Sequence, residues 1–116
     1  MIEDDPASMA LGLRRVESAP GAVFEMTVRP DHANLLGSTH GGVVFSLAER
    51  AMALTADGAV TVDAHLVLTG VSRPGDVLRA LVEPATSGRT LSSYRVTVTR
   101  DDGRIVGVVT GATLER

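Results

Sequence analysis

The feature that most constrains the fold is a segment from Gly42 to about Ala56 that is apolar around nearly its whole circumference. A surface helix carries its apolar residues along one stripe, whereas a helix that is apolar on almost every side must be covered by protein. The segment follows a glycine at position 41, and the Asp57-Gly58 pair after it is typical of a helix end. We therefore expect one long, buried helix at the centre of the fold.

Segments with the pattern of β-strands lie on both sides of this helix. Residues 22–29 alternate between polar and apolar side chains, as a half-buried strand does. Four more strand-like segments follow the helix, separated by turn signals, at residues 60–69, 76–85, 91–100 and 104–114. We expect an α+β fold, in which an antiparallel sheet, with its last four strands in a meander, wraps around the central helix.

The beginning of the chain predicts a short helix over Ala7–Val16. The length of 116 residues suits one hydrophobic core, so we expect residues 1–116 to form a single domain. The apolar content of 44% is high for this length, and since no apolar run is long enough to span a membrane, it fits a subunit interface. The acidic start, Met-Ile-Glu-Asp-Asp-Pro, differs from a basic signal peptide and favours a cytoplasmic protein.

Composition excludes several classes of function. The chain has no cysteine and no lysine, which excludes disulfide scaffolds, thiolate sites and Schiff-base chemistry. Three aromatic residues and a net charge of -3 argue against a nucleic-acid partner. The histidines, His32, His40 and His65, have no recognisable metal-ligand spacing, so we expect neither a metal nor another cofactor.

The candidate chemistry lies between Asn34 and Glu49. Glu49 lies in the middle of the predicted helix among apolar neighbours, where an unpaired carboxylate is costly. In one interpretation it belongs to a solvated stripe with Ser46, Arg50, Ala53 and Asp57 at helical spacing, where it could pair with a neighbour. In the other it is a general base or nucleophile whose pKa is set by its apolar surroundings.

The residues at the start of the helix also have two interpretations. The backbone N–H groups of Gly41 and Gly42 could polarise a carbonyl and hold an oxyanion, or the glycines could serve a tight approach of the backbone. His40 could be a base, but a histidine beside glycines more often orients a loop by hydrogen bonds. Asn34 could position a water or a substrate carbonyl, or support its own turn. Ser46 lacks the G-x-S-x-G setting of a serine hydrolase.

The spacing between Gly41 and Glu49 bears on where a site could form. Eight residues of helix separate their backbones by roughly 12 Å. A carbonyl held by Gly41 therefore cannot be attacked by Glu49 of the same chain. If both act in one reaction, they come from different subunits across a two-fold interface, which gives two equivalent sites.

This pattern resembles the hotdog-fold acyl-CoA thioesterases, specifically the PaaI-like group of phenylacetate degradation. The resemblance covers about residues 10–114 and is carried by Asn34-x5-His40-Gly41-Gly42-x3-Ser46-Leu47-Ala48-Glu49, Thr61-Val62-Asp63 and Gly75-Asp76. It implies an antiparallel sheet around one long helix and hydrolysis of a small or aromatic acyl-CoA. It also implies acyl-CoA as the partner and a homo-oligomer, either a dimer or, as we favour, a tetramer built as a dimer of dimers.

The resemblance also implies a role for each site residue. The N–H of Gly41 polarises the thioester carbonyl, and Glu49 of the partner subunit attacks it or activates water. Asn34 orients the substrate or the water, His40 supports the loop, and Thr61 helps to place the water. The PaaI-like group usually has Asp at the position of Glu49, whereas one type of 4-hydroxybenzoyl-CoA thioesterase uses Glu, so the acyl group stays open.

A second hypothesis is a hotdog protein that binds or senses acyl-CoA without turnover. It predicts acyl-CoA binding that is indifferent to Glu49→Gln, and no hydrolysis. A hydratase is disfavoured because the chain lacks the Asp-x4-His pair of those hotdog enzymes. Arginines near turns, such as Arg73, Arg89 and Arg104, are candidates for the CoA phosphates, without an assignment.

Overall fold

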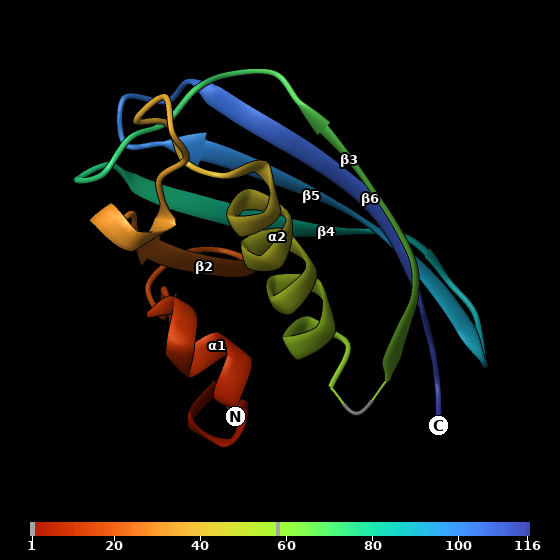
Figure 1. The fold of residues 1–116 in the computed structure, drawn as a ribbon. Coiled ribbons are helices and arrows are strands. Elements are labelled where there is room, and N and C mark those ends of the chain that lie inside the picture. The colour runs from red at the N-terminus through yellow and green to blue at the C-terminus, as the bar shows by residue number, and fades with distance from the viewer. Residues whose placement is uncertain (1, 58) are drawn as a thin grey trace.

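One antiparallel sheet curves around one long helix, α2, in the computed structural model, which describes residues 2–57 and 59–116 (Figure 1). In chain order the elements are η1 (Ile2–Asp4), α1 (Pro6–Leu11), β1 (Arg14–Arg15), β2 (Ala22–Thr27), η2 (Pro30–His32), α2 (Gly41–Thr55), β3 (Val60–Leu68), β4 (Val77–Ser87), β5 (Leu91–Arg100) and β6 (Ile105–Leu114). This arrangement confirms the α+β fold class. No helix in the described ranges is long and apolar enough to cross a membrane.

The strand order corrects the predicted meander. The sheet runs β1-β2-β4-β5-β6-β3, so β4, β5 and β6 form a meander of three strands and β3 lies at the far edge, beside β6. β3 cannot pair with β4, because β2 and β5 occupy both edges of that strand. The link at residues 69–76 returns the chain to β4 and is tied to the end of β2 by the Gly75 N–H, which donates to the Val28 carbonyl at 2.8 Å.

The predicted helix over Ala7–Val16 is wrong in its second half. Helix α1 ends at Leu11 because Gly12 adopts a left-handed backbone conformation with φ of 73°. The Gly12 amide donates to the Met9 carbonyl and closes the helix. The chain then runs in the extended conformation as β1 and pairs with β2. The pattern that predicted a helix continues past Gly12, but the left-handed conformation of this glycine ends the helix.

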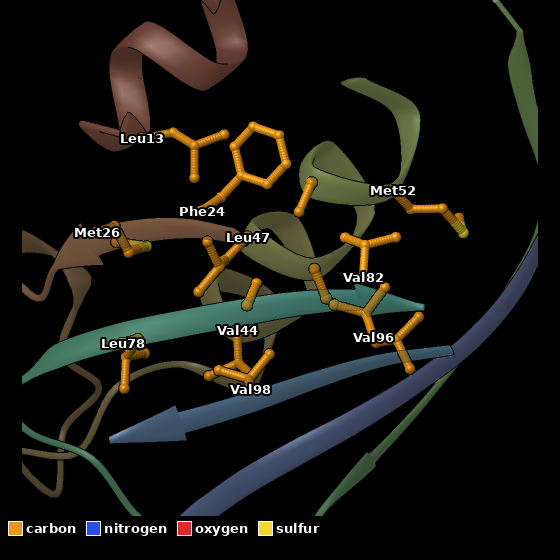
Figure 2. Close-up of a cluster of buried hydrophobic side chains, with 14 of the residues drawn as sticks. Leu13, Phe24, Met26, Val44, Leu47, Met52, Leu78, Val82, Val96 and Val98 are labelled. Carbon is orange, nitrogen blue, oxygen red and sulfur yellow. The ribbon is translucent and has the colours of Figure 1, made fainter. Parts of the chain in front are cut away.

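Helix α2 packs its fully buried side against the concave face of the sheet (Figure 2). Its buried residues are Val44, Leu47, Ala48, Ala51 and Met52, and they meet Phe24 and Met26 of β2, Leu78 and Val82 of β4, and Val96 and Val98 of β5. The other side of the helix stays partly exposed, although it too is apolar. The chain alone therefore leaves this helix less buried than the sequence predicts.

The ends of α2 lie within one residue of their predicted positions. The helix begins at Gly41 instead of Gly42 and ends at Thr55 instead of Ala56. Asp57 follows in the left-handed region with φ of 35°. The Gly58 half of the predicted helix end lies outside the described residues.

Candidate active site

The start of α2 presents backbone donors without acceptors. His40 is the N-cap residue, and its carbonyl accepts the amides of Val43 and Val44. Within the described ranges, the amides of Gly41 and Gly42 donate to no other group. They lie at the positive end of the helix dipole, where an anion or a polarised carbonyl oxygen is stabilised. This end of α2 can therefore hold an oxyanion.

Gly41 also fits the interpretation in which the glycine allows a tight approach. A Cβ atom at this position would lie 2.9 Å from Cδ1 of Leu68 on β3, which is closer than such contacts allow. A Cβ atom at Gly42 would meet open space. Glycine at position 41 thus permits the close approach of β3, and its free amide is available for chemistry as well.

Asn34 supports the loop before the helix. Its side-chain oxygen accepts the amides of Leu36 at 2.9 Å and Ser38 at 3.1 Å, so it closes the turn. Its side-chain nitrogen has no acceptor in the part of the chain that the structure describes. Asn34 therefore combines a structural oxygen with an available donor.

The resemblance gives His40 the role of supporting the loop, and that role stays a prediction. The side chain of His40 is exposed and makes no hydrogen bond within residues 2–57 and 59–116. The loop is held by His32, whose Nδ1 accepts the Arg29 amide at 2.9 Å and whose carbonyl accepts the His40 amide at 2.9 Å. Burial lowers the pKa of His32, which keeps its ring neutral and able to accept. The imidazole of His40 is free to face a ligand.

A shallow hollow of about 420 Å³ lies beside this loop and is lined by Ala33, Asn34, Leu35, Leu36 and His40. Leu35 is 105% exposed and Leu36 is 89% exposed. Two adjacent leucines that are almost fully exposed are unusual for a monomeric surface.

Glu49 is a paired carboxylate, and its partner is the neighbouring Arg50, as the stripe interpretation allowed. Nε and Nη2 of Arg50 donate to Oε1 and Oε2 of Glu49, both at 2.7 Å. Thr61 of β3 adds a third bond from its hydroxyl to Oε2 at 2.8 Å. The Glu49 side chain is 18% exposed. The structure thus brings Glu49 and Thr61 together.

The surroundings of Glu49 keep it ionised. Burial by itself raises the pKa of Glu49, but the hydrogen bonds from Arg50 and Thr61 and the charge of Arg50 lower it below the ordinary value for a glutamate. Because the pKa is lowered in the folded protein, these contacts stabilise the fold at neutral pH. That contribution is lost as the pH falls through the lowered pKa.

A larger open groove of about 1160 Å³ contains Glu49, Arg50 and Thr61. Its other walls come from the first residues of the chain, from β1 and from the second half of α2. The groove and the hollow beside Asn34 and His40 share no lining residue. Two groups of candidate residues therefore lie toward opposite ends of α2 and remain separate within one chain.

Sequence reasoning missed two residues of the groove, Arg50 and Asp5. Arg50 is the neighbour of Glu49 in the sequence, but its helical spacing favours a place in a solvated stripe. Nη1 of Arg50 donates to Oδ2 of Asp5 at 3.1 Å, a contact between residues that are 45 positions apart in the sequence. Among the described residues, no group of three or more His, Asp or Glu side chains is arranged to hold a metal ion.

Comparison with known proteins identifies the same family as the sequence motif. A family model described as acyl-CoA thioesterase N-terminal domain matches residues 28–114. The phenylacetic acid degradation protein PaaI from Thermus thermophilus, solved as a mutant, superposes with a TM-score of 0.88 at 34% identity, covering 97% of this chain and 100% of that chain. The Escherichia coli PaaI structure gives a TM-score of 0.89 at 27% identity, covering 98% of this chain and 86% of that chain.

A third structure, the protein smu.793 from Streptococcus mutans bound to acetyl CoA, superposes with a TM-score of 0.80 at 25% identity, covering 88% of this chain and 86% of that chain. The strand order, the buried helix and the family match agree with one another. The chain belongs to the hotdog-fold acyl-CoA thioesterases, in the PaaI-like group.

Proposed function

We propose that this thioesterase hydrolyses a small or aromatic acyl-CoA, of the phenylacetyl type, to the free acid and CoA in a site formed by two copies of the chain. The observation that carries the proposal is the separation of the candidate residues into two places on one helix. Glu49 and Thr61 lie in the groove, and the free Gly41 amide begins the same helix about 12 Å away. A two-fold axis brings the groove of one copy to the helix start of the other.

In the proposed reaction, the Gly41 amide donates to the thioester carbonyl oxygen and stabilises the negative charge that forms on it. Glu49 of the second copy acts in one of two ways. As a nucleophile, its carboxylate forms a bond to the acyl carbon, the C–S bond breaks, and water then cleaves the resulting anhydride. As a general base, it takes a proton from the water that attacks the acyl carbon directly. In both routes the CoA sulfur leaves and is protonated.

The remaining site residues have supporting roles in this proposal. The free side-chain nitrogen of Asn34 orients the substrate or the attacking water, and the Thr61 hydroxyl fixes one oxygen of Glu49. The exposed imidazole of His40 faces the substrate, where it can donate or accept a hydrogen bond.

The surface of the chain supports a dimer. Strand β3 is an edge of the sheet with one side unpaired, and a long apolar edge readily pairs with another strand. Four of its large apolar residues are about half exposed, namely Val60, Val62, Val67 and Leu68. The two leucines of the loop and the partly exposed side of α2 extend the apolar area. We propose that this surface forms the dimer, and that two dimers form the tetramer expected from the family.

The names of the relatives support the substrate class. The acetyl-CoA complex of the Streptococcus mutans protein supports a CoA thioester as the ligand. The phenylacetic acid degradation proteins support an aromatic acyl group. In this chain the groove that holds Glu49 has apolar lining from Leu13, Ala53 and Leu54, which suits a short or aromatic acyl chain.

A panel of thioesters tests the proposal. We expect the purified protein to release CoA from phenylacetyl-CoA, benzoyl-CoA and short straight-chain acyl-CoAs, with kcat/KM on the order of 10⁴ M⁻¹s⁻¹ or more for the best substrate. Free thiol is measured continuously, and palmitoyl-CoA serves as the long-chain contrast. Acyl-CoA binding without release from any member of the panel would favour the sensor hypothesis. A preference for palmitoyl-CoA would contradict the proposed substrate class.

A further inference from the structure

All three nitrogens of the Arg50 guanidinium group donate hydrogen bonds. Nε and Nη2 hold both oxygens of Glu49, and Nη1 holds Oδ2 of Asp5. The Arg50 side chain is only 25% exposed, so water competes weakly for these bonds. A planar fork that binds both oxygens of a carboxylate fixes the orientation of that carboxylate as well as its position.

Asp5 is itself held in place by the first residues of the chain. We call residues 2–11 the N-terminal segment. The hydroxyl of Ser8, which is fully buried, donates to Oδ2 of Asp5, and the Asp5 carbonyl accepts the Met9 amide at 3.0 Å. At the far end of the segment, Nη2 of Arg29 donates to the Ala10 carbonyl at 2.9 Å. The segment is therefore attached to the body of the protein near both ends.

We propose that Arg50 is a positioning residue that orients the Glu49 carboxylate and places a positive charge beside it, and that the N-terminal segment, through Asp5, fixes the position of Arg50. The inference rests on the proposed role of Glu49 in hydrolysis. It makes the N-terminal segment part of the active site, although that segment lies outside the motif on which the family resemblance rests.

The geometry explains why such a residue is needed. Thr61 holds only one oxygen of Glu49, and one hydrogen bond leaves the carboxylate free to rotate. Arg50 removes that freedom and supplies a positive charge beside a partly buried acid. The lowered pKa of Glu49 agrees with this arrangement. Asp5 keeps the guanidinium plane from swinging away toward solvent, because it binds the edge opposite to Glu49.

Any test must distinguish the effect of Arg50 on Glu49 from the effects of other charged groups nearby. Those lining the same groove are Glu3, Asp4, Asp5, Arg14, Arg15, Glu17, Asp57 and Arg116. Strand β3 contributes the neutral Thr61, and in the described residues β4, β5 and β6 contribute no lining residue. In the proposed dimer, His40 of the second copy also faces the carboxylate. A measurement that reports Glu49 itself is therefore needed beside the rate.

The first test is the pH dependence of turnover in Arg50 variants. We expect Arg50→Gln to lose up to about 100-fold in kcat at neutral pH, the cost of misplacing a reacting group by an ångström, with KM little changed. The acid limb of its kcat/KM profile shifts to higher pH, since the charge that favours ionised Glu49 is gone. Arg50→Lys restores the position of the acid limb but not kcat, because an ammonium group supplies charge without the fork.

Carbon-13 NMR of glutamate-labelled protein gives the second readout, which does not depend on activity. The Glu49 carboxyl signal is assigned by its absence in Glu49→Gln, and its titration moves to higher pH in Arg50→Gln. Arg79→Gln is the matched control, because Arg79 donates to Glu25 with both Nε and Nη2 on the exposed face of the sheet. That variant leaves the Glu49 titration and the rate profile unchanged. An unchanged Glu49 titration in Arg50→Gln would overturn the inference.

The role of Asp5 is tested by a double-mutant cycle. We expect Asp5→Asn to lower kcat by less than Arg50→Gln does, and the double variant to be no slower than Arg50→Gln alone. Losses that multiply would place Asp5 outside the Arg50 pathway and overturn that part of the inference. Circular dichroism checks that each variant is folded. If Glu49→Gln keeps full activity, the proposed catalytic role of Glu49 fails, whereas the NMR titration still decides whether Arg50 favours the ionised form of Glu49.

Discussion

Replacing Glu49 by glutamine is expected to reduce thioester hydrolysis by about 10²–10⁴-fold, the usual contribution of a positioned acid–base group. The side-chain amide of the variant can still accept hydrogen bonds, but it neither attacks a thioester nor takes a proton from water. Acyl-CoA binding should change little, because the amide of glutamine has nearly the same size and shape as the carboxylate it replaces. The measurement is kcat/KM by thiol release, with acyl-CoA affinity determined separately by calorimetry.

Glu25→Gln is the matched control for this variant. Glu25 is also paired with arginine, through Arg14 and Arg79, but it lies on the sheet face that points away from α2. We expect its rate to stay near that of the unmodified protein. A Glu49→Gln protein that is as active as Glu25→Gln would contradict the catalytic role of Glu49.

Removing the N–H group of residue 41 should have an effect of similar size. Gly41 is the first residue of α2, a position where proline is favoured, since its missing N–H leaves no helical hydrogen bond unmade. The preceding residue, His40, has φ of -56° and ψ of 136°, an extended conformation that proline tolerates before it. We expect Gly41→Pro to be folded and to lose about 10²–10³-fold in kcat, as for the loss of one oxyanion donor.

The Gly41→Ala variant distinguishes the effect of losing the N–H group from the effect of adding a Cβ atom. Both variants place a Cβ atom against Cδ1 of Leu68, where the end of a flexible side chain has to move, but only alanine keeps the N–H. We expect alanine to lose far less activity than proline, in the same thiol-release assay. Equal losses in the two variants would show that the close approach of β3, and not the amide, matters at this position.

The central helix and the strand segments could be predicted from the sequence because their patterns are local. The ends of α2 lie one residue from the expected positions, and the five main strands fall where the alternation placed them. The position of β3 could not be predicted in this way. Which edge a strand joins depends on the route of the chain around α2, and no local pattern of β3 specifies β6 as its neighbour.

The candidate site was predictable to a similar extent. Glu49 could be singled out because an unpaired carboxylate is costly in an apolar helix. The glycine pair could be singled out because the first amides of a helix have no partner within the helix. The contact between Arg50 and Asp5 could not be foreseen, since it depends on where the N-terminal segment folds back on α2. The role of His32 in the loop was also missed, because its spacing in the sequence does not distinguish a buried imidazole acceptor from a surface histidine.

Subunit mixing tests the central claim, that Glu49 and Gly41 of different copies form one site. The Glu49→Gln and Gly41→Pro proteins are each expected to be inactive. In a mixed dimer, one site combines the intact Gly41 of the first variant with the intact Glu49 of the second, and the other site carries both substitutions. Because random exchange makes about half of the dimers mixed, about a quarter of all sites are restored. Native mass spectrometry verifies the exchange. We expect recovery to about that quarter of the original rate. Verified mixed dimers with no more activity than the separate variants would contradict it.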